Sequence, residues 1–151
     1  MEKKIKHKLG IIVPYRDRKE QLDKFVFHMS EYLLTTDHTI IVVEQVDEND
    51  FNRGKLLNIG FNAAVKEGCD YVVFHDIDLL PIKADYSYAD RPTHLIGEIQ
   101  TPEGFDRTLF DEYFGGVTLF PCSVFQAING YSNEFWGWGF EDDNLMLRCT
   151  S

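Results

Sequence analysis

Nine consecutive residues near the C-terminus combine three kinds of residue that suit ligand binding and acid–base chemistry. They are Phe135-Trp136-Gly137-Trp138-Gly139-Phe140-Glu141-Asp142-Asp143. Aromatic rings offer faces on which a sugar ring or another flat apolar surface can lie, and glycines let the backbone approach a ligand closely. The three carboxylates supply a general base and hydrogen-bond acceptors for hydroxyl groups. A purely structural interpretation stays open, in which the tryptophans pack in a core and the acids cap a helix.

A second acidic stretch, His75-Asp76-Ile77-Asp78-Leu79-Leu80-Pro81, follows an apolar run at residues 71–74. If the chain stays extended here, the side chains of Asp76 and Asp78 point to the same side. Two carboxylates at a strand end suit Mg2+ or Mn2+ held jointly with substrate phosphates. The alternative is a pair of loop acids that cap the following turn. His75 could ligate or support a ligand, although a lone histidine at a strand end more often does neither.

Three arginines are candidates for binding an anionic ligand. Arg16 and Arg18 follow the first apolar run, and Arg53 stands near Phe51 at the entrance of an expected helix. Open α/β sheets bind ligands at the carboxyl ends of their strands. For Arg16 and Arg18, two solvated side chains at a helix entrance are an equal alternative.

Hydrophobic patterning predicts alternating strands and helices, which indicates an α/β fold with a mostly parallel central sheet. Apolar β-branched runs predict buried strands at residues 9–14, 39–44 and 71–74, with further strands expected at 94–97 and 113–120. Helices are expected at residues 19–34, 55–67, 123–128 and 144–149. The first of these helices has five apolar residues at helical spacing on one face, Leu22, Phe25, Val26, Met29 and Leu33. Asn52 is expected to cap the second helix, and Gly68 to end it.

Composition excludes several classes of partner. The 151 residues suit a single domain spanning residues 1–151, and a formal net charge of −10 argues against binding to nucleic acid. No apolar run approaches the roughly 20 residues of a membrane span, and the basic start lacks the apolar segment of a signal peptide. We therefore expect a cytoplasmic location. Three cysteines without close pairing, Cys69, Cys122 and Cys149, are interpreted as buried thiols.

Five segments together resemble the beta-1,4-galactosyltransferase family, inverting glycosyltransferases of the GT-A fold that use nucleotide-sugar donors. In the family's order they are Val13-Pro14-Tyr15-Arg16-Asp17-Arg18, residues 51–61, residues 75–81, Tyr113-Phe114-Gly115-Gly116 and residues 136–143. The sequence of residues 75–81 is most similar to that of the branch that adds galactose to xylose on proteoglycan linkers. Since the chain carries no membrane anchor, we expect a bacterial relative.

The resemblance implies a GT-A type α/β fold, with a Rossmann-like sheet flanked by helices, and transfer of a hexose to a sugar hydroxyl with inversion. The hexose would be galactose from UDP-galactose, and Asp78 would ligate Mn2+ or Mg2+. Residues implied to bind the donor are Pro14, Tyr15, Arg16, Arg18, Phe51, Arg53, Asp76, Ile77, Tyr113, Gly116 and Trp138. Those implied to bind the acceptor are Trp138, Gly139, Glu141, Asp142 and Asp143, with Asp142 as the catalytic base.

Two departures from the family pattern bear on these roles. Phe140 occupies a position where the family often has glycine or a polar residue, which implies a reshaped acceptor pocket. Family members also continue beyond the position of Ser151 and gain further metal ligands there, including a histidine. The resemblance thus implies a domain shortened at its C-terminus, with an incomplete protein ligand shell around Asp78.

Two alternative functions follow. One is a non-catalytic module that binds a nucleotide sugar or glycan and lacks the full metal shell. The other is a different Asp-x-Asp enzyme, such as a nucleotidyltransferase or a phosphatase. The segment around Trp138 speaks against the second, because phosphoryl chemistry needs no aromatic sugar platform.

Overall fold

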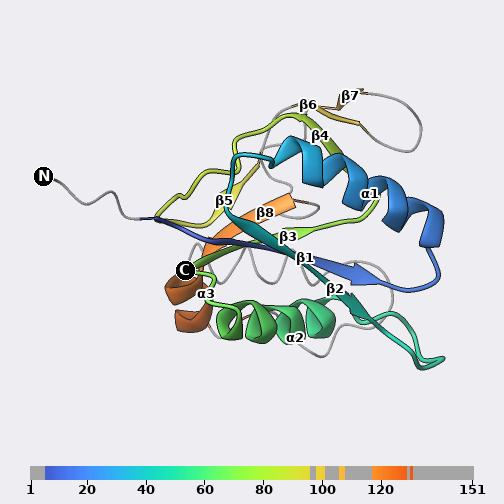
Figure 1. The fold of residues 1–151 in the computed structure, drawn as a ribbon. Coiled ribbons are helices and arrows are strands. Elements are labelled where there is room, and N and C mark those ends of the chain that lie inside the picture. Colours follow the sequence, from blue (N-terminus) through green and yellow to red (C-terminus); the bar gives the residue numbers. More distant parts are fainter. Residues whose placement is uncertain (1–5, 96–97, 101–105, 108–116, 129, 131–151) are drawn as a thin grey trace, which may run out of the picture.

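The main sheet has five strands in the order β2-β1-β3-β8-β5. The computed structural model describes residues 6–95, 98–100, 106–107, 117–128 and 130 (Figure 1). Strand β1 pairs in parallel with β2 and β3, whereas β8 pairs antiparallel with β3 and β5. Four of these five strands therefore run in the same direction, and the predicted α/β fold with a mostly parallel sheet is confirmed. The strands are β1 Leu9–Tyr15, β2 His38–Glu44, β3 Tyr71–His75, β5 Thr93–His94 and β8 Val117–Pro121.

Helices cover both faces of this sheet (Figure 1). Helix α1 (Lys19–Tyr32) lies on one face, and α2 (Arg53–Lys66) lies with α3 (Cys122–Ala127) on the other. All three helices match their expected ranges to within two residues at either end. The helix expected at 144–149 lies outside the described residues. A small antiparallel sheet joins β4 (Leu80–Lys83), β6 (Glu98–Gln100) and β7 (Asp106–Arg107).

Alternation along the strands creates two hydrophobic cores. Successive side chains of a strand point to opposite faces, so Ile11 and Val13 of β1 pack in the core that contains Phe25 of α1. Ile12 packs instead in the core that contains Phe61 of α2. Cys69 and Cys122 are buried free thiols in that second core, as expected, whereas Cys149 lies outside the described residues.

The ends of α2 also follow the sequence. The side-chain oxygen of Asn52 accepts a hydrogen bond from the Lys55 backbone N–H at 3.0 Å, which confirms the predicted cap. Beyond the other end of the helix, Gly68 has a φ of 85°, a conformation that glycine adopts at little cost. The strand–helix–strand spacing is therefore fixed by local signals that can be read from the sequence.

Three expectations were wrong in detail. Strand β2 is at the edge of the described sheet and only partly buried, and Val42 is 38% exposed. A continuous apolar run cannot by itself distinguish an edge strand from a central one. Val26 lies on the exposed side of α1 rather than in the core. Strand β4 was missed because it contains Pro81, and proline is tolerated in a strand at a sheet edge, where β4 lies.

Gly60 allows α2 to lie close to the sheet. A Cβ at this position would stand 2.4 Å from Cγ2 of Ile12 and 2.9 Å from Cγ2 of Val43. Both contacts are with β-branched side chains that have little freedom to move aside. We expect Gly60→Ala to lower the free energy of unfolding by about 1–3 kcal/mol, the usual cost of overpacking, although alanine favours helices. Denaturant unfolding measures the change.

Asn62→Ala, on the exposed side of the same helix, is the matched control. It should change the stability by less than about 0.5 kcal/mol. Equal stability of the two variants would contradict the close approach at Gly60.

Candidate functional site at the carboxyl edge of the sheet

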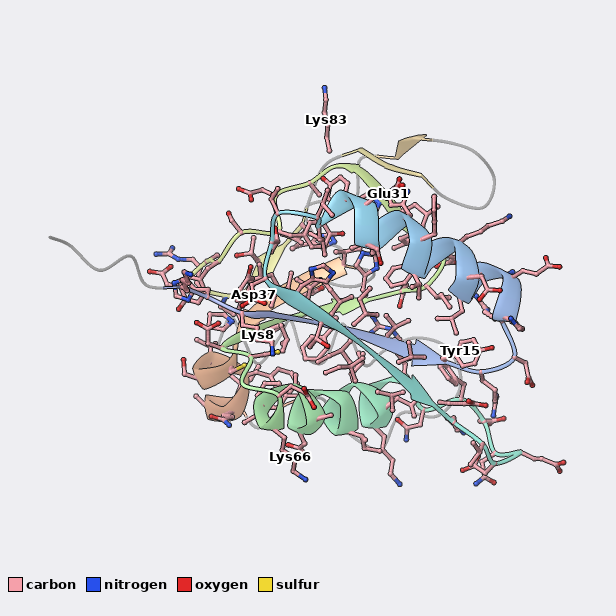
Figure 2. All side chains as sticks on the ribbon, viewed as in Figure 1. Lys8, Tyr15, Glu31, Asp37, Lys66 and Lys83 are labelled. Carbon is pink, nitrogen blue, oxygen red and sulfur yellow. The ribbon has the colours of Figure 1, made fainter. Side chains whose placement is uncertain are left out.

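The carboxyl ends of β1, β2 and β3 bring three chain segments to one edge of the sheet. Arg16 and Arg18 follow β1, residues 45–52 follow β2, and Asp76 and Asp78 follow β3. Figure 2 labels Tyr15 at this edge and Lys8 beside the opposite end of β1. The arginines and acids selected from the sequence therefore lie at the edge where α/β proteins bind their ligands.

An ion pair joins two of these segments. Nε of Arg53, the first residue of α2, donates to Oδ1 of Asp76 at 2.8 Å. The Arg53 side chain is 11% exposed and that of Asp76 is 29% exposed, so the pair is partly shielded from water. Charge-assisted hydrogen bonds of this kind are stronger than neutral ones. The pair therefore ties the start of α2 to the segment that follows β3.

Gln45 organises the loop between β2 and α2. The side chain is buried, and its Nε2 donates to Oδ1 of Asp47 at 2.8 Å and to the carbonyl oxygens of Asn49 and Asp50. Its Oε1 accepts from the backbone N–H of Asn52 at 2.9 Å. The hydrogen bond from Gln45 also holds the pKa of Asp47 below its usual value. The polar and acidic residues 45–50 predict only a loop, and the amide directly after an apolar strand is the one local signal of this role.

Arg16 also holds this loop, through hydrogen bonds to its backbone. Its Nη1 donates to the carbonyl oxygens of Asp47 at 3.2 Å and Asn49 at 2.7 Å. The guanidinium carbon lies 5.5 Å from the ring centroid of Phe51, within the range of a cation–π contact. The structure thus brings Arg16 and Phe51 together, as a shared ligand site would require.

Arg16 and Arg18 flank Asp17, and their side chains reach different segments of the edge. Asp17 has a φ of 51°, in the left-handed region, which aspartate tolerates better than most residues. Arg16 turns to the loop after β2, whereas Nη1 of Arg18 lies 4.0 Å from Oδ2 of Asp78. Arg18 is exposed and Asp78 is half-buried, and ion pairs open to water in this way contribute little to stability.

Residues 76–79 form a turn and are not extended. Strand β3 ends at His75, and the Leu79 N–H donates to the Asp76 carbonyl oxygen at 3.4 Å. The alternation argument for Asp76 and Asp78 was therefore wrong, because it holds only in extended backbone. Asp76 pairs with Arg53 instead, and Asp78 lies near Arg18. We call residues 76–79 the acid turn.

The acid turn offers hard oxygen ligands but not a complete metal site. Among the residues that the structure describes, no group of three or more histidine, cysteine or acidic side chains could hold a metal ion. The side chain of Asp78 is 34% exposed, and its carboxylate is of the ligand type that Mg2+ and Mn2+ prefer. It fits a metal whose further ligands come from a phosphate-bearing substrate or from residues outside the described ranges.

Other predicted donor residues have differing exposure. Pro14 is buried and Tyr15 is half-buried. The side chain of Ile77 is 5% exposed and packs in the α1-side core, so a donor contact there would have to use its backbone. Seven predicted site residues lie outside the described residues, namely Tyr113, Gly116, Trp138, Gly139, Glu141, Asp142 and Asp143. Their roles stay predictions.

His75 is fully buried behind the acid turn. Its Nδ1 lies 2.8 Å from the Asp76 carbonyl oxygen, and its Nε2 lies 2.8 Å from the Tyr86 hydroxyl. Burial lowers the pKa of His75 from its ordinary 6.5 to about 4, so the imidazole is neutral near pH 7. Because the ring is fully buried, His75 cannot ligate a metal or substrate at the surface, and a supporting role is the one that its position leaves open.

The lowered pKa of His75 makes folding sensitive to acid. As the pH falls from 6.5 towards 4, His75 becomes protonated in the unfolded chain but stays neutral in the native protein. The free energy of unfolding therefore falls. Above 6.5 the ring is neutral in both states, and below 4 it is charged in both. The shift from 6.5 to about 4 corresponds to a loss of roughly 3 kcal/mol. Urea unfolding at a series of pH values should reveal this loss in the wild type and a shallower acid dependence in His75→Asn.

The fold is that of an α/β protein, and its candidate site combines arginines, an aromatic ring and carboxylates. This combination suits a phosphate-bearing ligand that is held together with a divalent cation. Comparison with known proteins specifies the class. Residues 2–90 match the family model described as the N-terminal region of glycosyl transferase group 7. Residues 105–151 match a second model, described as the N-terminal domain of galactosyltransferase.

Curated and structural relatives agree with these matches. The chain is 40% identical over 144 residues to a xylosylprotein 4-beta-galactosyltransferase of Caenorhabditis elegans, covering 94% of this chain and 50% of the relative. It is 40% identical over 153 residues to mouse beta-1,4-galactosyltransferase 4, covering 97% and 44%. The crystal structure of the catalytic domain of Drosophila beta-1,4-galactosyltransferase 7 in complex with xylobiose superposes with a TM-score of 0.82 at 38% identity, covering 94% of this chain and 60% of that one. A mutant of the Drosophila enzyme, solved with manganese, UDP-Gal and xylobiose, superposes with a TM-score of 0.83.

The chain belongs to the glycosyl transferase group 7 family, which includes the beta-1,4-galactosyltransferases. It spans about half the length of the curated relatives that it matches. Within the described ranges, no helix combines the length and apolar character needed to cross a bilayer. The expected bacterial origin and the single-domain organisation stay predictions.

Proposed function

We propose that the protein transfers galactose from UDP-galactose to a hydroxyl group of a sugar acceptor, with inversion at the anomeric carbon and dependence on Mn2+. The observation that carries the proposal is the meeting of Arg16, Phe51 and Arg53 with Asp76 and Asp78 at one edge of the sheet. Membership of the galactosyltransferase family, and the UDP-Gal and manganese in the related Drosophila complex, support the same ligand set.

The donor would bind along the carboxyl edge. Arg53 would contact the diphosphate, with Asp76 holding its guanidinium in place through the 2.8 Å hydrogen bond. Phe51 and Arg16 would line the nucleotide pocket beside it, with Pro14, Tyr15 and Arg18. These short-range contacts would hold the anionic donor although the protein as a whole carries a net charge of −10.

Asp78 would be the protein's carboxylate ligand to Mn2+. When bound, this metal acts as a Lewis acid and stabilises the negative charge that develops on the leaving diphosphate. The exposure of the Asp78 carboxylate leaves room for substrate oxygens to share the coordination. Further ligands would come from outside the described residues.

The acceptor would bind to the Trp-Gly-Trp-Gly segment and the acids that follow it. Trp138 would provide the sugar platform, Gly139 close approach, and Glu141 and Asp143 hydrogen bonds to the acceptor. Asp142 would take the proton of the acceptor hydroxyl as that oxygen attacks the anomeric carbon and the bond to the diphosphate breaks. The transition state would resemble an oxocarbenium ion, as in glycoside hydrolysis.

A donor panel with and without Mn2+ tests the proposal. UDP-galactose, UDP-glucose, UDP-N-acetylgalactosamine and GDP-mannose would each be incubated with a xylose-terminated acceptor, and products read by mass spectrometry. We expect a galactosylated product from UDP-galactose, dependent on Mn2+ and lost with a chelator. Binding of UDP-galactose without product and without need for metal would support the non-catalytic module instead. We also predict a cytoplasmic location.

A further inference from the structure

His75 lies on the buried side of the acid turn, where a bound donor cannot contact it. His75 is the last residue of β3, and its side chain is fully buried on the α1 face of the sheet. Its ring lies 4.9 Å from the ring of Phe25 in an edge contact and 5.9 Å from that of Tyr86 in a stacked one. A histidine enclosed in this way can influence the donor site only through the residues that it holds.

The hydrogen bonds of His75 identify its tautomer. A backbone carbonyl oxygen can only accept, so Nδ1, at 2.8 Å from the carbonyl oxygen of Asp76, must carry the hydrogen. In a neutral ring Nε2 is then an acceptor, and it accepts from the Tyr86 hydroxyl at 2.8 Å. Each ring nitrogen therefore has one partner that suits one tautomer.

Tyr86 is itself fixed at a second point. Its carbonyl oxygen accepts from the Tyr71 hydroxyl at 2.8 Å, and its side chain is 3% exposed. Tyr71 begins β3 and His75 ends it. The chain Tyr71–Tyr86–His75 therefore runs along the α1 face of β3, and each hydrogen bond depends on a side chain held in place by the core.

The Asp76 carbonyl oxygen is the point at which this chain meets the acid turn. The same oxygen accepts from the Leu79 N–H at 3.4 Å, a long hydrogen bond that closes the turn. The shorter bond from His75 fixes the same peptide group more firmly. The orientation of that peptide determines where the carboxylates of Asp76 and Asp78 point relative to Arg53 and Arg18.

We propose that His75 is a positioning residue for the donor site: as the Nδ1–H tautomer, held by Tyr86, it fixes the Asp76 carbonyl and so orients the acid turn for the diphosphate and its metal. This inference rests on the proposed function for its ligand. It adds His75 and Tyr86 to the residues that determine donor affinity, although neither would contact the donor.

Two substitutions of His75 test the hydrogen bonds of its two ring nitrogens separately. An asparagine amide reaches about as far as Nδ1 and can still donate to the Asp76 carbonyl, whereas a glutamine amide reaches towards the Tyr86 hydroxyl. We expect His75→Gln and Tyr86→Phe to weaken binding of UDP with Mn2+ by roughly tenfold or more, the size typical of partners that orient ligand residues. His75→Asn keeps the hydrogen bond to the Asp76 carbonyl and loses only the support from Tyr86, so its affinity should lie between those of the wild type and His75→Gln. Titration calorimetry with UDP and Mn2+ measures all four proteins.

Steady-state kinetics and a stability control distinguish positioning from simple loss of fold. The KM for UDP-galactose should rise in His75→Gln and Tyr86→Phe while the KM for the acceptor stays constant. Phe125→Leu, which opens a cavity in the core on the opposite side of the sheet, should lower thermal stability and leave UDP affinity unchanged. If His75→Asn binds UDP as weakly as His75→Gln, or if Tyr86→Phe binds as tightly as the wild type, the positioning role is overturned.

The ring nitrogens can be observed directly. Two-bond 15N–1H correlation spectra distinguish Nδ1–H from Nε2–H, and loss of one set of signals in His75→Asn assigns them to His75. A ring protonated at Nε2 would overturn the inference. If the wild-type protein binds no UDP, the proposed function fails, while this spectrum still decides whether His75 holds the Asp76 carbonyl.

Discussion

Asp142→Asn should reduce galactose transfer by about 10²- to 10⁴-fold, the usual contribution of a general base, while leaving the affinity for UDP-galactose unchanged. Asparagine keeps the size of the side chain but cannot take the proton of the acceptor hydroxyl. The attack on the anomeric carbon would then begin from a neutral hydroxyl, which is a poorer nucleophile. Donor binding depends on the carboxyl edge of the sheet and should not respond.

Initial rates with saturating donor and acceptor measure the first quantity, and titration calorimetry with UDP-galactose and Mn2+ measures the second. Asp143→Asn is the matched control, because it makes the same chemical change one residue away and should lose far less activity. Turnover in Asp142→Asn comparable to that of the wild type would refute the assigned base. Equal losses of activity in both variants would mean that Asp142 and Asp143 act together and that Asp142 alone is not the base.

Arg53→Gln should weaken UDP binding by about 10- to 100-fold. A hydrogen bond to a charged group contributes about 1.5–3 kcal/mol, and each 1.4 kcal/mol corresponds to a tenfold change in affinity. The side chain of Arg53 is 11% exposed, so little solvent is available to replace its contacts. Arg53→Lys should recover only part of the affinity, because an ammonium group cannot reproduce the planar fork of a guanidinium.

Lys55→Gln removes the same charge from the same turn of α2 at an exposed position. It therefore measures how much of the loss comes from long-range charge alone. A double-mutant cycle with Asp76→Asn should reveal coupling, because the 2.8 Å hydrogen bond joins the two side chains. If Lys55→Gln weakens UDP binding as much as Arg53→Gln does, Arg53 has no specific role at the diphosphate.

Local patterns in the sequence sufficed for the elements that carry the site. The β-branched runs before Pro14 and Glu44 predicted β1 and β2, and the cap at Asn52 predicted the start of α2. These signals depend on residues within one turn or one strand. They also placed the arginines and acids at the correct edge, because parallel strands must share that edge.

Contacts between distant residues could not be predicted in the same way. Asp76 of the acid turn pairs with Arg53, 23 residues away in the sequence, and an i, i+2 pattern contains nothing about that partner. The hydrogen bond between Tyr86 and His75 likewise spans 11 residues and an irregular segment. Such tertiary contacts decide whether a carboxylate faces a metal, a cation or water, whereas periodicity decides only the element on which it stands.

The pairing of arginines at the carboxyl edge has a consequence for the kinetics of donor binding. Arg53 lies against Asp76, Arg18 lies near Asp78, and Arg16 is engaged by backbone carbonyls. Arg16 keeps its charge, but the acidic side chains at residues 44–50 outnumber it, so the edge projects little positive potential, while the chain as a whole carries a net charge of −10. An anionic nucleotide sugar approaching from a distance meets net repulsion rather than electrostatic attraction. Added salt screens that repulsion, so moderate ionic strength should speed the encounter, opposite to its effect on proteins that attract their ligands by opposite charge.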